Sequence, residues 1–504
     1  MASNVVPTAC PSLTRSHAPM QFVQLHDDVL ILIAEHLESL ATLRTACTCK
    51  RLHVTMRDLA IRDVYFKTPR QLDGFISYVL SDSSRPNLIR SIEIGFRELP
   101  GDLELFSRLS GLLHDTGNLS CLVVRPDYEA LICQQSTWRH TINNIPSLQS
   151  MNIYYPGSAA FRGFAEMRSR LRYLTIDSPT YYEDYALPHL GALERLEKLK
   201  MSQCDSAMLS DDSIWPTVVS LTFEDALITA TIVVHAFPNV RDLTLRFVEL
   251  AFWPEDDGDS FWSYLNSLTV CWFEILSFDY LCPVRQLTFI EFKEYDGCEV
   301  DDWEECLRVL AHTRPVVFSF PVIASTDERI PVALFEATHK RLRCLKITLT
   351  EESKIGDIYV WIHNLWNGIG TLPLLSFCLC IRRNYPVTAQ DVRENLDSSM
   401  TYFHIPTILS RVFVNTQFIG FDLANFPESK TYWWCVVGRE GAHADLFGLS
   451  EEWSPLLTDA LDAMDETSES LARVERSLPR EVSLAWRTYQ SSLIPIENDL
   501  ESSG

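Results

Sequence analysis

The segment 24–67 reads QLHDDVLILIAEHLESLATLRTACTCKRLHVTMRDLAIRDVYFK and decides the fold expected at the start of the chain. Asp27 and Asp28 suit the first turn of a helix, where carboxylates complement the helix dipole. Residues 29–34 follow as an unbroken apolar run, which at about 100° per residue goes all the way round a helix. Because two more short helices are predicted over 43–52 and 54–66, we expect a three-helix bundle here.

Such a bundle has more apolar surface than it can hide by itself. A unit of about 45 residues buries only a small part of its surface and is marginally stable alone. Each large apolar side chain left in water forgoes roughly 1.5 to 3 kcal/mol. Apolar side chains on more than one face therefore imply a second binding surface, provided either by the rest of this chain or by another protein.

The apolar positions of this segment resemble those of an F-box. Three residues depart from the usual pattern: His26 replaces a proline, Thr48 a valine and Leu52 a tryptophan, and one extra residue stands near Leu40. The resemblance covers less than a tenth of the chain. It is carried by Leu25-His26-Asp27-Asp28-Val29-Leu30, Ile33, Leu37, Leu43 and Cys49-Lys50-Arg51-Leu52.

The resemblance implies docking onto the Skp adaptor of a Skp–cullin–F-box ubiquitin ligase, and through the adaptor onto a cullin. The alternative is an ordinary helical cap on the domain that follows. The residues that the resemblance assigns to adaptor binding are Leu25, Asp28, Val29, Leu30, Ile33, Leu37, Leu43, Lys50 and Arg51.

Composition bounds the remaining possibilities. A chain of 504 residues exceeds one ordinary core, so several domains or one repeat array are expected. A hydrophobic content of 46% with a mean hydropathy of -0.01 is typical of a soluble, packed protein. The formal charge of -24 argues against a nucleic acid or an anionic membrane as partner, because the mean field repels both.

The cysteines and the absence of long apolar windows indicate the compartment. The 14 cysteines are scattered and include no CxxC pair with metal-ligand spacing, so reduced thiols are expected. No window approaches 18 uninterrupted apolar residues. We therefore predict a cytoplasmic or nuclear protein that holds no metal and no cofactor.

From residue 88 onward one short pattern returns, an apolar residue followed three and five positions later by two more. The middle residue recurs every roughly 19 to 32 positions over most of the array, as when each unit is one strand and a returning segment. The copies are centred on Ile92, Leu122, Met151, Leu174, Leu199, Leu221, Leu243, Leu268, Leu287, Leu345, Phe377 and Phe421, with a weaker copy around Phe318 and Phe320.

Helix-like segments separate these strands, which predicts an α/β solenoid. The array resembles an irregular leucine-rich-repeat domain of the kind often joined to an F-box, which implies a horseshoe of parallel strands with outer helices. It lacks the regular Asn or Cys that closes each turn in that family. The alternative is a doubly wound α/β domain. Helices are predicted over 103–113, 159–170, 226–236, 303–312 and 359–365.

The position between the last two apolar residues of each copy should point to the opposite sheet face. Five threonines share it, and a solvated strand face explains them without any function. The functional interpretation is that this face holds a protein substrate. The positions predicted to face a substrate are Thr175, Lys200, Thr222, Thr244, Thr269, Thr288 and Lys346. Asp422 occupies the corresponding position in the last copy.

Two acidic inserts, 253–259 and 299–305, interrupt the array. They can hold a basic peptide, or a metal if their oxygens converge, although a solvated loop is the commoner outcome. A strand over 433–437 and a helix over 454–478 are predicted to end the fold. The domains expected are a disordered start (1–20), the F-box-like bundle (21–67), a linker (68–87), the solenoid (88–440), a C-terminal helical segment (441–496) and a disordered acidic tail (497–504).

No catalytic motif is found: the chain has no GxxxxGK[ST] loop, no HExxH, no GxSxG and no complete GxGxxG. We therefore predict a protein that is not an enzyme but the substrate-recognition subunit of a ubiquitin ligase, promoting ubiquitin-dependent degradation by proximity. The alternative is a repeat scaffold whose N-terminal helices only cap the solenoid.

Overall fold

The computed structural model divides the chain into two compact units, Met1–Arg172 and Tyr173–Gly504. The structure describes residues 25–480 and 483 except 36, 38, 97–103, 135, 165, 178–192, 207–208, 210–213, 251–261, 272–281, 291–302, 324–340, 352–371, 373, 384–397, 425–430, 441–442, 450–452, 466–467 and 477.

The first unit begins with the three predicted helices, α1 (Asp27–Glu35), α2 (Ser39–Ala46) and α3 (Lys50–Ala60). The first starts at Asp27 as predicted. The second and third both start about four residues earlier than predicted. Their apolar side chains meet in one small core, whose buried members are Leu30, Ala34, Ala46, Leu52 and Met56, with Leu25, Cys49 and Leu59 packed against it.

The last turn predicted for the third helix is instead a strand, β1 (Asp63–Phe66). It pairs in parallel with β2 (Ser91–Ile94), with Val64 opposite Ile92 and Phe66 opposite Ile94. Valine, tyrosine and phenylalanine favour strands when a neighbouring strand is present. The sheet of the first unit therefore starts within the segment that we predicted to be wholly helical.

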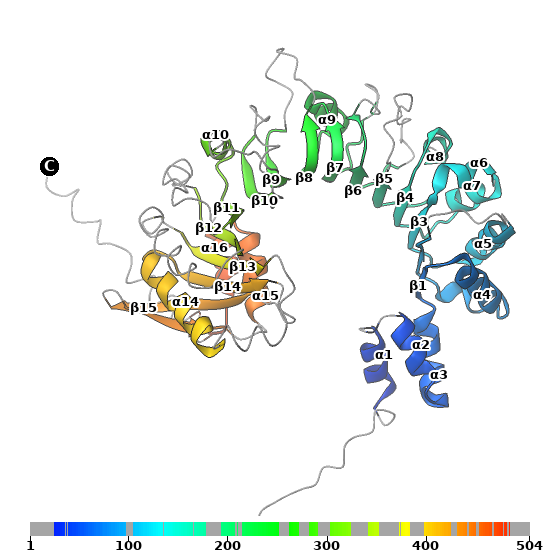
Figure 1. Ribbon diagram of the computed structural model, residues 1–504, viewed down its shortest axis with the longest axis horizontal. Coiled ribbons are helices and arrows are strands. Elements are labelled where there is room, and N and C mark those ends of the chain that lie inside the picture. Colours follow the sequence, from blue (N-terminus) through cyan, green and yellow to red (C-terminus); the bar gives the residue numbers. More distant parts are fainter. Residues whose placement is uncertain are drawn as a thin grey trace, which may run out of the picture. The chain divides into compact units, whose positions relative to one another are not determined.

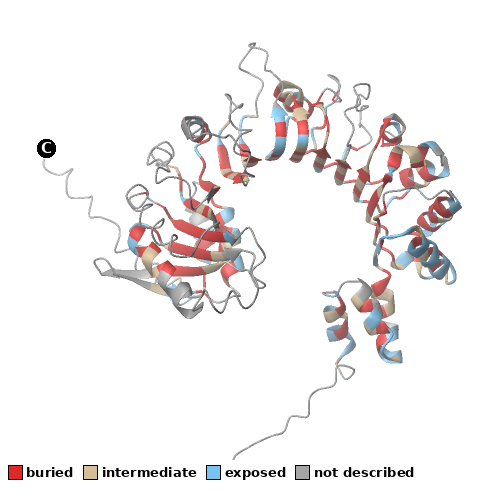
Figure 2. Ribbon diagram, in the orientation of Figure 1, coloured by how far each residue is buried: buried red, intermediate tan, exposed pale blue. Residues whose placement is uncertain are grey.

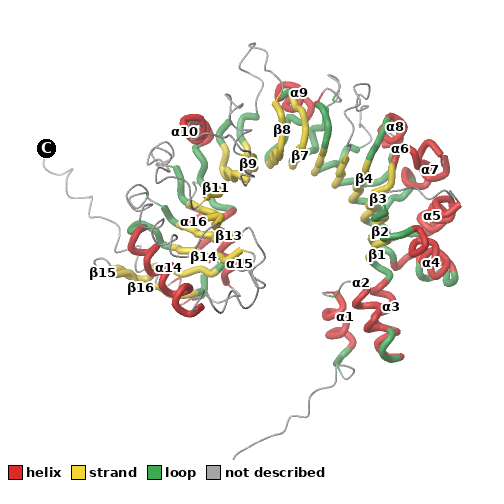
Figure 3. Tube along the Cα trace, viewed as in Figure 1, coloured by secondary structure: helices red, strands yellow, loops and turns green. Residues whose placement is uncertain are grey.

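The helices that follow lie on one side of the four-stranded sheet of this unit (Figure 3). Phe106 and Trp138 are fully buried between helices and strands, with their rings edge to face at 5.7 Å. The remaining elements are α4 (Pro69–Leu80), the short 3-10 helix η2 (Pro86–Leu88), α5 (Glu104–Asp115), β3 (Cys121–Asp127), α6 (Tyr128–Gln134), α7 (Ser136–Asn143), β4 (Ser150–Tyr154) and α8 (Ser158–Phe164).

The segment 68–87, predicted to be a linker, contains α4. Thr68 caps the helix by accepting a hydrogen bond from the backbone N–H of Gln71, and Pro69 suits the first position. Leu72, Ile76 and Val79 are buried at helical intervals, so this segment belongs to the core of the unit.

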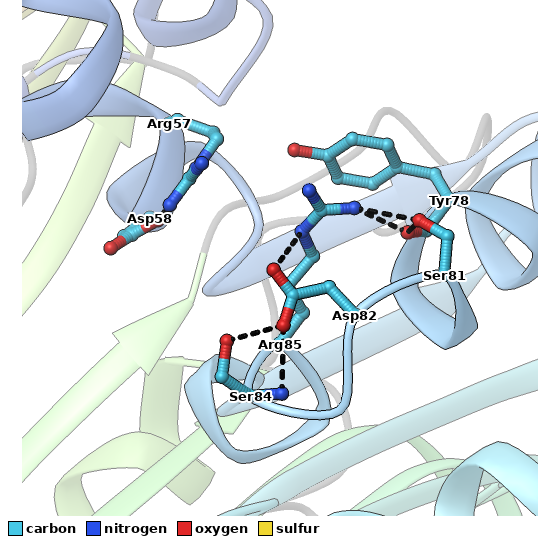
Figure 4. Close-up of polar contacts among 7 residues, drawn as sticks. All are labelled: Arg57, Asp58, Tyr78, Ser81, Asp82, Ser84 and Arg85. Carbon is cyan, nitrogen blue, oxygen red and sulfur yellow. Dashed lines mark hydrogen bonds and ion pairs between the residues drawn. The ribbon is translucent and has the colours of Figure 1, made fainter.

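A polar network closes the C-terminal end of α4 (Figure 4). The Arg85 guanidinium lies 4.1 Å from the Tyr78 ring and donates to the Tyr78 carbonyl at 2.6 Å and to the Ser81 hydroxyl. Asp82 accepts hydrogen bonds from the backbone and the hydroxyl of Ser84. Because these contacts satisfy the last carbonyls of the helix and its following turn, we assign the network a structural role.

The second unit consists of strands in chain order (Figure 1), parallel from β5 to β14. They are β5 (Tyr173–Asp177), β6 (Lys198–Ser202), β7 (Ser220–Ile228), β8 (Asp242–Leu250), β9 (Leu265–Cys271), β10 (Val284–Ile290), β11 (Val317–Ile323), β12 (Cys344–Glu351), β13 (Ser376–Arg383), β14 (Phe418–Ala424), β15 (Tyr432–Glu440) and β16 (His443–Gly448). Their helices are α9 (Ala230–Ala236), α10 (Trp303–Thr313), α14 (Ser398–Val412), α15 (Trp453–Asp462) and α16 (Ser468–Arg476).

The repeated apolar pattern did locate the strands. Each predicted copy coincides with a strand, and its middle residue is buried in every case. Buried and less buried residues alternate along β7 and β8 (Figure 2), as expected for strands with one face in the core. The protein is therefore a mixed α/β protein with an open, mostly parallel sheet.

The helix predictions are less accurate. α5 and α10 match the segments predicted over 103–113 and 303–312. α8 ends at Phe164, six residues early, and α9 begins only at Ala230 because β7 continues to Ile228. The helix predicted over 359–365 lies outside the described residues.

The C-terminal end of the sheet also differs from the prediction. The strand predicted over 433–437 is longer and pairs antiparallel with β14 on one side and β16 on the other. β16 lies in the segment that we predicted to be helical. The single helix predicted over 454–478 is two helices, α15 and α16, whose buried residues include Leu457, Leu461 and Val474.

Left-handed residues recur at one aligned position in three neighbouring repeats of the sequence pattern. Gln203, Asp225 and Phe247 have φ of 52°, 53° and 55°. Each follows a residue of one aligned row, since Ser202 pairs with Glu224 and Glu224 with Arg246. The same left-handed backbone position therefore recurs directly after β6 and within β7 and β8, although three different residue types occupy it.

Candidate functional site

Two surfaces were predicted to bind partners, and the first is the N-terminal bundle. Leu30 is fully buried in the bundle core, so it stabilises the bundle and presents no surface to a partner. Arg51 is also engaged internally: it donates to the Leu25 carbonyl at 2.9 Å and to the Asp27 carboxylate at 3.0 Å, which joins the start of α1 to α3.

The other predicted docking residues are more accessible. Val29 is 40% exposed and Leu37 is 37% exposed. Leu32, which was not among the predicted docking residues, is the most exposed apolar residue of α1, at 58%. Asp28 and Lys50 are exposed, Leu25 and Ile33 are partly buried, and the side chain of Leu43 lies outside the described residues.

The core of the bundle is drawn from residues 25–59 alone among the described residues. Val29 and Leu32 therefore remain on the surface after the bundle has formed its core. Together with Leu37 they form what we call the apolar surface of the bundle, an arrangement that favours association with a second protein.

The second predicted surface is the sheet face of the second unit that carries the threonine row, which we call the second face. The pairing register aligns the predicted positions on neighbouring strands. The row runs Thr175, Lys200, Thr222, Thr244, Thr269, Thr288, Ser319, Lys346 and Cys378.

The last member of the row was predicted wrongly. Cys378 pairs with Gly420, whereas Asp422 lies two residues further along and pairs with Cys380. A Cβ at Gly420 would lie 2.9 Å from Cys378 Sγ and from two ring atoms of Trp433. A glycine is therefore needed where the Trp433 ring crosses β14, and this packing requirement replaces the expected apolar pattern.

Charged and aromatic side chains accompany the threonines at the start of the row. Lys200 forms an ion pair with Glu224 of the next strand. Lys198 lies 5.5 Å from the centroid of the Tyr173 ring. The threonines themselves are neither buried nor fully exposed. This part of the second face is polar and partly exposed, and it offers both hydrogen-bonding groups and charges.

Further along, α15 and α16 cover the second face. Val317, Cys344, Cys378 and Phe418 point to this face by their register, and all four are buried in one cluster. The cluster also contains Leu457, Ala460 and Leu461 of α15, Val474 of α16, and Met464, Leu478, Trp433 and Cys435. Neither face of the sheet from β11 to β14 therefore forms an open groove among the described residues.

Polar contacts hold α15 in this position. The Trp433 indole donates to the Thr458 hydroxyl at 2.9 Å. Arg285, which is 8% exposed, donates to the carbonyl oxygens of Asp462 and Met464, the latter at 3.0 Å. A cation on the last carbonyls of a helix stabilises its C-terminus.

Lys346, which was predicted to face a substrate, is partly buried and lies next to Cys344 and Cys378 of the covered part. Desolvation lowers its pKa, but nearby Cys378, Cys380, Asp462 and Asp422 outweigh that effect and leave the pKa raised. Burial raises the pKa of Asp462, against the opposing effect of Lys346. Lys346 is therefore a partly buried charge close to Asp462 at the end of α15.

No arrangement for binding a metal is present within the described part of the chain. No group of His, Cys, Asp or Glu could hold a metal ion there. Burial raises the pKa of the Cys344 thiol to about 12 and also raises that of Cys378, so both favour the protonated form. The first acidic insert and residues 299–302 of the second lie outside the described residues.

Among the described residues, no helix combines the length and apolar character needed to cross a membrane. Comparison with known proteins finds no family model that matches the chain and no curated protein that resembles it.

Proposed function

We propose that this protein is the substrate-receptor subunit of a Skp–cullin–F-box-type ubiquitin ligase. Its N-terminal bundle docks the Skp adaptor, and the second face of its sheet binds a protein substrate. The observation that carries the proposal is the apolar surface of the bundle, because Val29, Leu32 and Leu37 stay exposed while Leu30 completes a separate core.

We further propose that the strands form an irregular solenoid similar to leucine-rich-repeat domains. The sequence order of the strands and their parallel pairing support this architecture. The left-handed position shared by Gln203, Asp225 and Phe247 supports it as well, since successive repeats of a solenoid have similar backbone geometry. Chemistry would belong to partner subunits, and this chain would contribute proximity.

Adaptor docking is tested by co-purification with the Skp adaptor. The double variant Val29→Asp with Leu32→Asp places charges on the apolar surface without altering the core. We expect at least a tenfold loss of adaptor recovery, because burying an unpaired carboxylate at an interface is strongly unfavourable. Equal recovery from the variant and the wild type would refute docking at this surface.

Leu456→Asp on α15 is the matched control. Leu456 is 49% exposed, close to Leu32 in residue type and exposure, and it lies outside the bundle. Adaptor recovery should not change in this variant. Leu30→Asp is unsuitable as a docking test, because it buries a charge in the bundle core and would unfold the bundle.

A second candidate is a scaffold whose helices only cap the first strand. It is favoured by the short connection between α3 and β1, which leaves two residues between them. The two functions predict different effects on β1 and β2 when the bundle is destabilised. If the bundle is a cap, Leu30→Ala should accelerate amide exchange in β1 and β2, whereas a docking module should leave that exchange unchanged.

A further inference from the structure

One cluster of side chains was not among the predicted sites. It lies on the sheet face of the first unit opposite the helices and draws one residue from each strand, Tyr65, Glu93, Arg125 and Tyr154. The partly exposed Tyr65 and Glu93 are neighbours in the register of β1 and β2. Helices α4 to α8 lie on the other side of these strands (Figure 3).

Arg125 is the centre of the cluster. Its Nε and Nη2 atoms both donate to Glu93 Oε1, at 3.1 and 2.8 Å. Its guanidinium also lies 5.8 Å from the centroid of the Tyr154 ring. One edge of the guanidinium is thus held by Glu93, and the terminal edge, which carries Nη1, donates to no other described residue. The side chain of Arg125 is 39% exposed.

The backbone presents Arg125 in an unusual way. Val124 pairs with Ile153 and Asp127 with Tyr154, so Arg125 and Pro126 are additional residues in β3. Such a bulge redirects the side chains that it contains, and bulges are common beside functional sites. The orientation of Arg125 is therefore set by a local irregularity in the strand and fixed by its bond to Glu93.

Tyr65 is held in place by a glycine. A Cβ on Gly95 would lie 2.7 Å from the Tyr65 hydroxyl oxygen and closer still to Tyr65 Cε2, so the phenol rests on the bare backbone of the residue that follows β2. Lys67 lies 5.7 Å from the centroid of the same ring. The electrostatic effect of the Tyr65 and Tyr154 phenols on the pKa of Arg125 is consistent with both hydroxyls lying near its guanidinium.

We propose that this cluster binds a carboxylate side chain, Glu or Asp, of an extended acidic segment of a protein partner. The terminal edge of Arg125 would take both carboxylate oxygens, the geometry in which guanidinium and carboxylate bind most strongly. The hydroxyls of Tyr65 and Tyr154 would donate to the same oxygens. The inference goes beyond the proposed function, because it adds a binding site on the sheet of the first unit and names the chemical class of its ligand.

The two units differ strongly in charge composition. Residues 1–172 contain 18 Lys and Arg against 16 Asp and Glu, whereas residues 173–504 contain 25 against 51. The first unit is therefore close to neutral in composition, whereas the second unit is strongly acidic. The Glu93 carboxylate beside the site favours a singly charged carboxylate over a doubly charged phosphate, since its repulsion grows with ligand charge.

The test measures fluorescence anisotropy of a short labelled peptide of alternating glutamate and glycine, added to the full-length protein. Two matched peptides replace glutamate by glutamine or by phosphoserine. We expect saturable binding of the glutamate peptide and at least tenfold weaker binding of the other two. Absence of binding, equal binding of the glutamine peptide, or preference for the phosphoserine peptide would overturn the proposal.

Variants assign the binding to the cluster. Arg125→Lys keeps the charge but loses the planar fork, and should weaken binding about tenfold. Tyr65→Phe and Tyr154→Phe keep the rings and should each weaken it about threefold. Gly95→Ala removes no ligand group but displaces the Tyr65 phenol, so it should match Tyr65→Phe.

Arg70→Ala is the control, because Arg70 is an exposed arginine on α4, outside the cluster. An equal loss of peptide binding in this variant would show that binding depends only on overall charge, and it would refute the site. Unchanged binding by Arg125→Lys would refute it too. No adaptor enters the assay, so failed adaptor docking and a failed peptide site are separate results.

Discussion

The second face of the sheet has two parts that share one register and differ in what lies over them. From β5 to β10 the row consists of threonines and Lys200, all partly exposed. From β11 onward the positions beside the row are Val317, Cys344 and Phe418, all buried under α15 and α16. The strands of both parts pair in the same parallel manner, so backbone geometry does not separate them.

Residue type follows the covering layer. A β-branched hydroxyl side chain suits a strand face in contact with water, because it fills the pleat and keeps a hydrogen-bonding group. A thiol or an aromatic ring suits a face that another layer covers. One sheet face can therefore be a candidate binding surface in one part and an internal packing surface in another.

The largest effect should come from breaking the covered part at its centre. Leu457 is fully buried in the cluster below α15. Leu457→Ala should lower the free energy of unfolding of the second unit by about 2 to 5 kcal/mol, since it removes buried methyl groups and leaves a cavity. Urea denaturation measures the change. Alkylation of Cys344 by iodoacetamide should also accelerate, because the same cover protects its thiol.

Alkylation supplies a control inside the same protein. Cys47 is exposed and lies in the bundle, far along the chain from the cluster. Its modification rate should not change in Leu457→Ala. If Cys344 stays as protected as before while stability falls, α15 is not what shields that part of the sheet.

Arg285 offers the next largest effect. Arg285→Met keeps the length of the side chain but removes its bonds to the carbonyl oxygens of Asp462 and Met464. We expect a loss of about 1.5 to 3 kcal/mol, the usual range for hydrogen bonds from a charged donor. Arg285→Lys, which keeps the charge, should recover part of the loss. Thermal unfolding followed by circular dichroism measures both variants.

Gly420 tests how closely the covered part is packed. Gly420→Ala should cost about 1 to 3 kcal/mol, because the new methyl group meets Cys378 and the Trp433 ring. Gly111→Ala is the opposite case: nothing lies within 4 Å of its added Cβ on α5, so it should stabilise by about 0.5 to 1 kcal/mol. A stabilising Gly420→Ala would contradict the close packing of Trp433 on β14.

The smallest effect is expected in the part that no described helix covers. Thr244→Val keeps the β-branched shape and removes only the hydroxyl of a partly exposed residue. The free energy of unfolding should change by no more than about 0.5 kcal/mol, as is usual at surface positions. A loss above about 1 kcal/mol would mean that this hydroxyl has a buried partner and that the row is structural.

Much of the sheet could be predicted because its apolar pattern is strong. In Leu221 and Phe223, or Leu243 and Leu245, side chains two apart point into one core and repeat with each unit. β1 was missed because Val64 follows Ala60 at a helical interval of four residues, and only the neighbouring strand β2 decides between the two structures. β14 was shifted by two residues because Gly420 breaks the pattern at a place fixed by Trp433.

The candidate sites were less predictable. A helix with apolar residues all round does not reveal which side forms the core, so Leu30 and Leu32 could not be separated before the positions of α2 and α3 were known. The cover over Cys344 comes from residues more than a hundred positions later in the chain. Arg125 lies in a bulge, which a strictly alternating pattern cannot place.

The pairing of each strand with its neighbours in sequence has a consequence for how such a protein can change. A longer return segment between two strands moves neither of them relative to the next, because each register is set only by the adjacent strand. Duplication of one strand with its return segment would lengthen the ladder without disturbing the rest. Recognition could then diversify strand by strand, at little risk to the ability of the chain to fold.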